Sequence, residues 1–511
     1  MKLINPKNSY KIVLTLIIFL TVSNLYAQQY PPSTTLSHVN YNPPAQLPEY
    51  LTPFIEENFE NMVTRISDQS VFNIGDQKQL RHAYSKRQAW NSDGSYIVLG
   101  GYPPKILDGN TYSFLGTVSN FGSLGWSNTN RLLSYSTSAS SNYFKIKQLD
   151  ESTLSCTTIF SRTFDDYNIL SHFTNESNIS MDDKYVGLYG TKSSTGNSCW
   201  VVVYDIESDI IVSETNLNTS FSNVDWVSMS HSGNYVVIAY VNIGSSSDNG
   251  IWRYDRNLNN NLQLVNQAHH ADLGVDLDGN EVLVYNGSND IVSTRLDGIG
   301  APIVYLNTAI SGGHVSCRNN NRPGWAYVND HGGISQNGDY VSFKEVFAVK
   351  LDNRPNGTTT VQRYTKHYSY VGNQSYYHEP HVIPNRDGTK VMFASTMEDF
   401  QTEQQTYPFS WIVETQNSNL GIEDNVLNEN DLIVFPNPSS GIVNIKLNNF
   451  QDASTITLIN LLGKAVYSES ISGNNGFTTD TSFNFSSIAK GVYFIRIQGK
   501  RKFITKKIIL K

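Results

Sequence analysis

The chain lacks the features that mark several common protein classes. Lys and Arg number 37 against 45 Asp and Glu among 511 residues, giving a formal net charge of −8. This balance argues against a nucleic-acid-binding domain, which is usually basic. An anionic ligand is not excluded, because a local group of Arg and Lys can reverse the potential at one cleft. There is also no Gly-x-Ser-x-Gly nucleophile elbow and no convincing pair of carboxylates, so a hydrolase is only a third interpretation.

Cysteine is scarce. The three residues Cys156, Cys199 and Cys317 leave at least one thiol unpaired in any exported form of the chain. Cys156 and Cys199 flank the third repeat described below, where they either pair or stay buried as free thiols. The sequence does not decide between these two states.

Long hydrophobic runs are also scarce, and the notable one lies near the N-terminus. Lys2, Lys7 and Lys11 precede the apolar stretch 12–22, and small or polar residues follow up to Ala27. The stretch is shorter than the ~20 residues that span a bilayer as a helix. We therefore predict a signal peptide over 1–27, cleaved after Ala27, and no transmembrane segment in the mature chain.

A short phrase recurs seven times between residues 85 and 395: a strand, a polar turn and an apolar strand. Examples are WNSDGSYIVLGG from Trp90 and VDLDGNEVLVYNG from Val275. An Asp-Gly pair supplies the positive φ that a two-residue hairpin needs. The first turn residues lie 36 to 59 residues apart, and they are Asp93, Thr129, Asp183, Ser232, Asp278, Asn337 and Asp387.

This period predicts the architecture. A four-stranded blade of about 40–50 residues cannot bury both faces alone, so blades must stack around a channel. The 30 Tyr, 23 Phe and 35 Gly suit an all-β protein rich in turns. We predict an all-β chain with a seven-bladed β-propeller over 28–415, in which functional residues gather at the mouth of the channel.

The C-terminal region carries a separate signal. From Ile433 the chain reads IVFPNPSSGIVNIKL, followed by short alternating strands and a Lys-rich end. These motifs resemble the C-terminal sorting domain of the type IX secretion system, a small Ig-like β-sandwich. The resemblance implies that the protein engages the type IX secretion machinery and is secreted or held at the cell surface. An ordinary accessory sandwich is the alternative, and the polar stretch 416–432 is the predicted linker to the sorting domain 433–511.

Histidines are concentrated in the last three predicted blades. Counting back six residues from the turn gives Asp272, His331 and His381 in blades five, six and seven. Such positions lie near the channel, and imidazole with thiolate suits Zn²⁺. The predicted ligands are His270, Cys317, His331 and either His381 or His314. The alternative is that Cys317 is a buried free thiol and the histidines are core groups or substrate contacts.

Several phrases resemble the propeller polysaccharide lyases, especially ulvan lyases and more distantly oligogalacturonate lyases. They include RHAYSKRQAWNSDGS (81–95), HHADLGVDLDGNEV, GGHVSCRNNNRPGWAYV and YYHEPHVIPNRDGTKVMFAS, and the likeness spans residues 81–411. The resemblance implies β-elimination within an anionic, uronate-containing algal polysaccharide, and a structural metal. Elimination needs a neutralised carboxylate, a base for the C5 proton and an acid for the departing O4.

In ulvan lyases a His and a Tyr handle these protons and an Arg faces the carboxylate. By this resemblance we predict His172, Tyr240 and Arg256 as the catalytic trio, although each also fits an ordinary surface or strand-end role. Arg318 and Arg322 are further candidates for substrate binding, because a guanidinium can bind carboxylate or sulfate. His82 and Tyr84 are also candidate substrate contacts, or a second acid and base pair.

We therefore expect an exported ulvan lyase that contains Zn²⁺. Two alternatives stay open: a glycan-binding propeller without catalysis, and a lyase of another uronate such as oligogalacturonate. A lyase leaves an unsaturated uronate that absorbs ultraviolet light, whereas a binder or a hydrolase does not.

Overall fold

The computed structural model separates into two compact units, residues 1–418 and 419–511. It describes residues 39, 42–73, 80–100, 103–172, 176–241, 249–267, 270–287, 290–307, 313–331, 344–354, 359–369, 378–397, 408–414, 432–447, 453–460, 465–470, 481–499 and 503–511. The predicted signal peptide and all of the predicted linker except Leu432 lie outside this set. Among the described residues, no helix is long and apolar enough to span a membrane.

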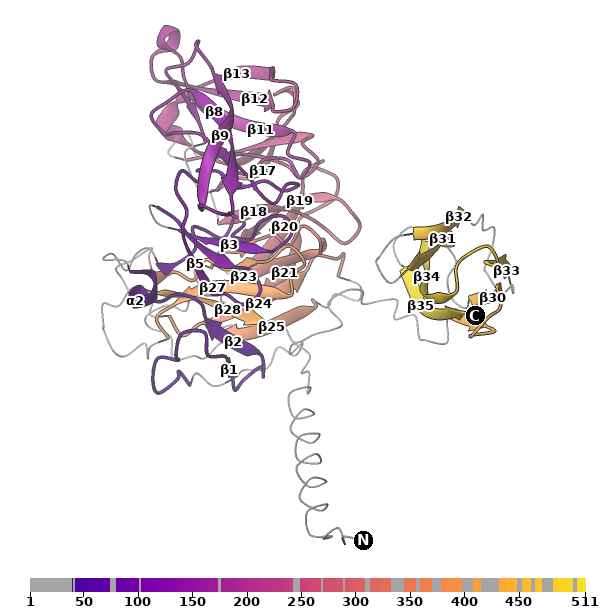
Figure 1. Cartoon of the computed structure of the whole chain (residues 1–511). Coiled ribbons are helices and arrows are strands. Elements are labelled where there is room, and N and C mark those ends of the chain that lie inside the picture. Colours follow the sequence, from indigo (N-terminus) through magenta and orange to yellow (C-terminus); the bar gives the residue numbers. More distant parts are fainter. Residues whose placement is uncertain are drawn as a thin grey trace, which may run out of the picture. The chain divides into compact units, whose positions relative to one another are not determined.

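Within the described part of the first unit, the strands form seven antiparallel sheets, as the repeat predicted (Figure 1). The first three blades consist, in chain order, of β3 (Tyr96–Leu99), β4 (Lys105–Asp108) and β5 (Phe114–Thr117); of β6 (Gly125–Trp126), β7 (Leu133–Ser136), β8 (Tyr143–Asp150) and β9 (Ser155–Thr163); and of β10 (Ile169–Ser171), β11 (Tyr185–Thr191), β12 (Ser198–Asp205) and β13 (Ile210–Ser220). In the first blade, a bridge from Trp90 to Ile97 takes the place of the first strand.

The next three blades repeat this order. They consist of β14 (Val224–Met229), β15 (Tyr235–Tyr240), β16 (Gly250–Asp255) and β17 (Leu262–Val265); of β18 (Ala271–Val275), β19 (Glu281–Asn286), β20 (Asp290–Arg295) and β21 (Ile303–Asn307); and of β22 (Val315–Ser316), β23 (Trp325–Asn329), β24 (Glu345–Lys350) and β25 (Val361–Lys366). Strand β18 contacts β22 of the next blade. The first strand of each blade is therefore the one nearest the channel, where neighbouring blades converge.

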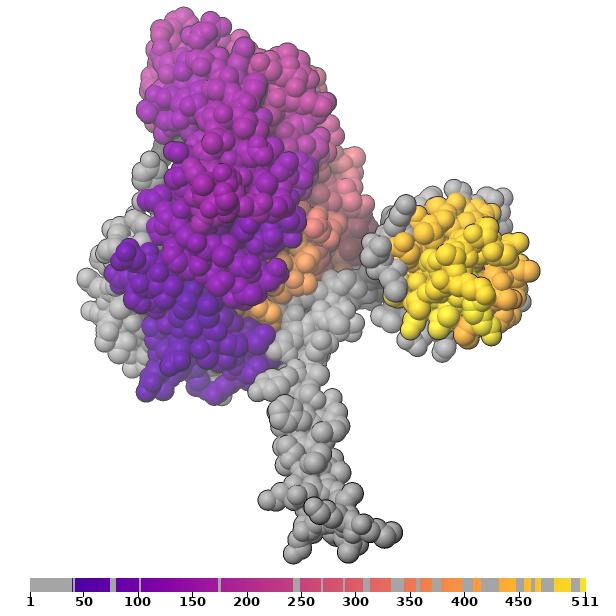
Figure 2. All heavy atoms as spheres, in the orientation of Figure 1, coloured from indigo at the N-terminus to yellow at the C-terminus, as the bar shows by residue number. Residues whose placement is uncertain are grey.

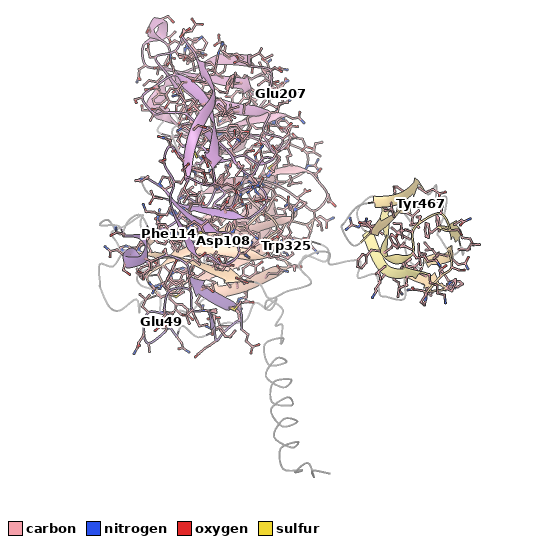
Figure 3. All side chains as sticks on the ribbon, in the orientation of Figure 1. Glu49, Asp108, Phe114, Glu207, Trp325 and Tyr467 are labelled. Atoms are coloured by element: carbon pink, nitrogen blue, oxygen red, sulfur yellow. The ribbon has the colours of Figure 1, made fainter. Side chains whose placement is uncertain are left out.

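The seventh blade closes the ring by joining the two ends of the propeller. It combines β26 (Ile383–Pro384), β27 (Lys390–Ser395) and β28 (Phe409–Glu414) with the early strands β1 (Phe54–Ile55) and β2 (Met62–Arg65). Strand β2 pairs antiparallel with β28, and the indigo N-terminal atoms lie directly against the orange atoms of the last blade (Figure 2). Beside them, Phe72 of the short helix α2 (Gln69–Phe72) packs on Phe114 of β5, which is marked in Figure 3.

The core of the propeller lies between blades. Seven clusters of buried apolar side chains fill the seven junctions between neighbouring sheets. Between blades five and six, for example, Val284 and Ile291 of one sheet pack with Val328 and Phe347 of the other. Burial of this apolar surface is the main force that holds the blades together.

The turns follow the sequence signals except in the sixth blade. Gly94, Gly233, Gly279 and Gly388 all have positive φ at hairpins between the first two strands of a blade. In the sixth blade Asn337 does not mark the hairpin between the first two strands, because β22 and β23 enclose an earlier turn through residues 317–324. The predicted turn at Asn337 itself falls within 332–343, outside the described residues.

The C-terminal unit is a small β-sandwich, as predicted. One sheet contains β29 (Leu432–Phe435), β30 (Ile442–Leu447) and β33 (Thr481–Asn484), and the other contains β31 (Ala453–Asn460), β32 (Ala465–Ser470), β34 (Gly491–Gly499) and β35 (Phe503–Leu510). Tyr467, marked in Figure 3, packs edge-on against Phe485 between the sheets.

Candidate active site and metal centre

Three histidines stand at equivalent places in three consecutive blades. His270 immediately precedes β18, His314 precedes β22, and His381 lies two residues before β26. The innermost strands of the three blades begin at the same end of the channel, so the three histidines lie close together there. The ring centroids of His270 and His314 lie 4.3 Å apart, and those of His314 and His381 lie 4.2 Å apart.

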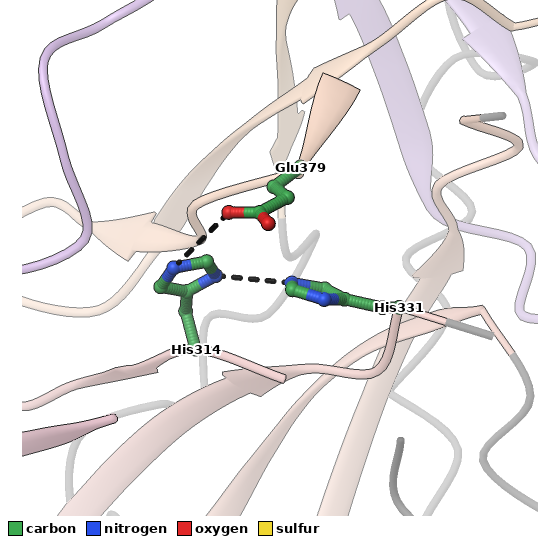
Figure 4. Close-up of side chains that lie close together, drawn as sticks. All are labelled: His314, His331 and Glu379. Carbon is green, nitrogen blue, oxygen red and sulfur yellow. Dashed lines mark hydrogen bonds and ion pairs between the residues drawn. The ribbon is translucent and has the colours of Figure 1, made fainter. Parts of the chain in front are cut away.

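A fourth histidine and a carboxylate complete the cluster. His331, just beyond the end of β23, lies with its Nε2 3.1 Å from Nδ1 of His314. The other nitrogen of His314, Nε2, is 3.6 Å from Oε2 of Glu379, and it has no hydrogen-bond partner among the described residues. Figure 4 shows the carboxylate and the His331 ring approaching His314 from two sides. Ligand atoms of His314, His331 and Glu379 all lie within 4.8 Å of one another.

Arg81 and His82 of the first blade support His381. Arg81 Nη2 donates to Nδ1 of His381 at 3.0 Å, so Nδ1 is the acceptor and Nε2 carries the proton. This Nε2–H then donates to Oε2 of Glu379 at 3.1 Å. His82 Nε2 donates to the backbone carbonyl of His381, which fixes the backbone at the same point. A chain of polar contacts from Arg81 thus orients the Glu379 carboxylate.

The cluster is held in a form suited to metal ligation. Burial lowers the pKa of His331 to about 3, and burial, with neighbouring charge, holds the pKa of His314 and His381 well below their usual range. These imidazoles are therefore neutral at physiological pH, as metal ligands must be. Burial also raises the pKa of Glu379 to about 7, against the opposing effect of Arg81.

Tyr84 packs against the same cluster. Its ring stands edge-on to His314 and His381, with centroids 5.2 and 4.8 Å away. The structure therefore brings His82 and Tyr84, predicted as a separate pair, to the predicted histidines. Glu379 and Arg81 were not among the predicted site residues. The signals were present, because Glu379 lies between two histidines of HEPH and Arg81 precedes His82.

Cys317, also among the predicted ligands, lies outside the group formed by His314, His331 and Glu379. Its side chain belongs to the apolar cluster between blades five and six, and its Sγ would lie 2.9 Å from a Cβ at Gly274. Burial holds the pKa of Cys317 well above its usual range. Cys317 is thus a core thiol, and Cys156 and Cys199 are also buried and free.

Two members of the predicted trio of His172, Tyr240 and Arg256 lie at opposite ends of one hairpin. In the hairpin of β15 and β16, Tyr240 pairs with Gly250, whereas Tyr235 pairs with Asp255, the neighbour of Arg256. Five residues of strand separate the two levels, about 17 Å. Tyr240 is buried and hydrogen-bonded to the hydroxyl of Tyr254 at 3.0 Å. The Arg256 guanidinium lies over the ring of Tyr185, 4.3 Å from its centroid.

His172 follows β10 of the third blade and lines two cavities. The inner one is shared with Arg87, Trp126 and Arg318, and the outer one is an open groove described below. Its backbone N–H donates to Thr137 Oγ1 at 3.4 Å.

The predicted carboxylate binders Arg318 and Arg322 both have internal partners. Arg318 makes a buried bidentate pair with Asp272, with Nε–Oδ2 at 2.9 Å and Nη2–Oδ1 at 3.0 Å, which ties blades five and six together. Arg322 donates to Tyr327 at 2.7 Å and to Gln362 at 2.8 Å, and it lies over the ring of Trp325, marked in Figure 3. Both guanidiniums thus have partners within the propeller, and Arg318 also lines the inner cavity with His172.

Comparison with known families identifies the C-terminal unit. Residues 433–511 match the family described as the secretion system C-terminal sorting domain. The chain thus carries the signal for type IX secretion, and the protein is secreted or placed at the cell surface. No curated protein sequence matches the chain.

Solved structures with similar folds include two oligogalacturonate lyases. One, in complex with manganese, is 13% identical, with a TM-score of 0.47 over 71% of this chain and 95% of that one. The other, from Vibrio parahaemolyticus, is 12% identical, with a TM-score of 0.48 over 71% and 96%. PorZ, a surface component of the type IX secretion system of Porphyromonas gingivalis, is 14% identical, with a TM-score of 0.34 over 86% and 60%. Such low identities are uninformative about activity.

Proposed function

We propose that the propeller is a divalent-cation-dependent polysaccharide lyase that cleaves uronate-containing glycans, with ulvan as the first substrate to test. The observation that carries the proposal is the convergence of His314, His331 and Glu379 at one end of the channel, within 4.8 Å of one another. The likeness of the blade phrases to ulvan lyases favours the same reaction. Export through the sorting domain gives the enzyme access to polysaccharides outside the cell.

The donor set fits a divalent cation but does not select zinc. Two neutral imidazoles and a carboxylate suit several first-row metals, and the predicted preference for Zn²⁺ rested partly on the thiolate of Cys317. The unpartnered Nε2 of buried His314 supports the presence of a cation, because an orphaned polar atom is costly in a protein interior. We propose that His314, His331 and Glu379 hold the ion.

The reaction is an elimination that needs no second reactant. The C5 proton of the uronate passes to a base, the C4–O4 bond breaks with formation of a C4–C5 double bond, and the departing O4 takes up a proton. When bound, the cation supplies positive charge that neutralises the substrate carboxylate and makes the C5 proton more acidic. The chain's own residues must then position the sugar and transfer both protons.

The residues around the cluster divide these tasks in our proposal. His270 is exposed beside His314, and we assign its imidazole the role of accepting the C5 proton. The Tyr84 hydroxyl is the candidate donor to O4, because its ring touches His314 and His381. Arg81 and His381 act as positioning residues, since they hold the Glu379 carboxylate in place.

The direct test is ultraviolet absorbance of the unsaturated product. Purified, metal-loaded protein is incubated with ulvan, polygalacturonate and alginate in parallel. A rise on ulvan is the expected result, and a rise on polygalacturonate alone would change the substrate but keep the reaction. If folded, metal-loaded protein produces no rise on any uronate, the lyase proposal fails and a glycan-binding propeller becomes the better account.

A further inference from the structure

An open groove runs outward from the channel over blades one to three. It begins at His172, after the inner strand β10, and passes Phe121 in the connection between β5 and β6. Its outer end is lined by Tyr143 and Lys147 of β8. Every residue that lines it is described in the structure, and none of them has a place in the histidine cluster.

The strand β8 explains why this face is polar. Tyr143, Lys145 and Lys147 alternate with Phe144 and Ile146, so the two sets point to opposite faces of the blade. Phe144 and Ile146 pack in the apolar junction with blade three. The other face turns toward blade one, where the first three residues form a row of one aromatic ring and two cations.

The groove has a charge opposite to that of the whole protein. Arg87 and Lys147 line it, and its lining includes no Asp or Glu, although acids outnumber bases in the chain. Lys145 stands beside it, with Nζ 4.0 Å from the centroid of the Tyr143 ring. Lys147 Nζ donates to the carbonyl of Asn120 at 2.7 Å, which holds the ammonium at the groove wall. A cation-lined groove on an acidic protein concentrates anions locally.

The groove is connected to the proposed centre by a short piece of chain. Tyr84 touches His314 and His381, and Arg87, three residues later, lines the groove and donates to the carbonyl of Gly122 at 3.1 Å. Three residues span at most about 11 Å. The backbone at Arg87, on the groove wall, therefore lies within about 11 Å of the backbone at Tyr84, which packs on the cluster.

We propose that this groove binds the carboxylate and sulfate groups of an extended anionic polysaccharide, so that the enzyme cleaves within chains. The inference rests on the proposed function, and it adds that the substrate is an extended, anionic polysaccharide. Lys147 and Arg87 supply the charge that binds the anions, and Phe121 and Tyr143 supply faces for sugar rings. The open outer end lets the chain continue beyond the cleavage point.

Binding is the appropriate test because it does not depend on turnover. We would measure affinity of the metal-free protein for ulvan, polygalacturonate, sulfate-only carrageenan and neutral galactomannan by affinity electrophoresis. Lys147→Gln should weaken binding of the charged polysaccharides about threefold, as loss of one partly exposed ion pair does. Tyr143→Ala should also weaken it. Lys184→Gln, which removes a similarly exposed lysine from blade three, should have no effect.

The outcomes separate this inference from the proposed function. Loss of affinity in Lys147→Gln, with no product from wild-type protein, would support the groove and overturn the lyase. Product formation with equal binding by Lys147→Gln, Tyr143→Ala and wild type would overturn the groove and keep the lyase. Failure of wild-type protein to bind any charged polysaccharide would also overturn the groove. Weaker binding of polygalacturonate but not carrageenan would assign the site to carboxylate, and the reverse to sulfate.

Discussion

The two sides of the channel differ in the chemistry that they present. Blades six and seven and blade one contribute neutral imidazoles, a half-buried carboxylate and Arg81, joined by direct contacts of 3.0 to 3.6 Å. Blades two and three contribute hydroxyl groups, aromatic rings and Lys147 around an open groove. In our proposal the first side holds a cation and moves protons, and the second side holds a sugar chain. Under that proposal, catalysis and substrate recognition lie on different sides of the channel.

The largest expected effect comes from Glu379→Gln, which changes the histidine and carboxylate cluster and leaves the groove intact. The substitution keeps the shape of the side chain but removes its charge, so the cation loses an anionic ligand. We expect kcat to fall by about 1000-fold or more, because metal stabilisation of the developing charge contributes several kcal/mol. Steady-state rates of uronate production measure this, with exposed Glu207→Gln as the control. Unchanged kcat in Glu379→Gln would remove Glu379 from the site.

A smaller effect, on stability, is expected from Asp272→Asn. This change leaves the buried Arg318 guanidinium without its charge partner between blades five and six. We expect the free energy of unfolding to fall by about 3 kcal/mol, as when one member of a buried pair is removed. Urea unfolding measures it. If the free energy of unfolding is unchanged while KM rises, Arg318 contacts substrate and must be counted among the substrate-binding residues.

The smallest effect is expected from Tyr240→Phe, because Tyr240 belongs neither to the histidine cluster nor to the groove. The change removes one hydrogen bond, to the Tyr254 hydroxyl, so the free energy of unfolding should fall by about 1 kcal/mol. Activity should be unchanged. A large loss of kcat with normal stability would restore Tyr240 as a catalytic residue and contradict our assignment.

Much of the propeller follows from short-range sequence signals. A two-residue turn with positive φ imposes a hairpin locally, which is why Gly94, Gly279 and Gly388 mark three blades correctly. The sixth blade was misassigned because Asn337-Gly338 also looks like a turn, whereas its first hairpin has the less regular turn at 317–324. Closure by β2 was not predicted, since pairing with β28 is set by long-range packing.

The site was harder to predict than the fold. Histidine enrichment pointed to His270, His314, His331 and His381, and the structure places these four rings close together. It could not show whether Cys317 is a metal ligand or a core residue, because a cysteine side chain suits both roles, and the structure places it in an apolar cluster. Sequence spacing does not report which end of a hairpin a residue occupies, so it could not show that Tyr240 and Arg256 of the predicted trio lie at opposite ends of one hairpin.

The most direct test of the account is the metal content of the purified protein, measured by mass spectrometry for wild type and for His331→Ala. Our account predicts about one equivalent of a divalent transition metal per wild-type chain and a loss of most of it in the variant. A thermal melt confirms that the variant is folded. Equal metal content in the two proteins, or no metal in wild type supplied with Mn²⁺ and Zn²⁺, would contradict the central claim that this cluster holds a cation.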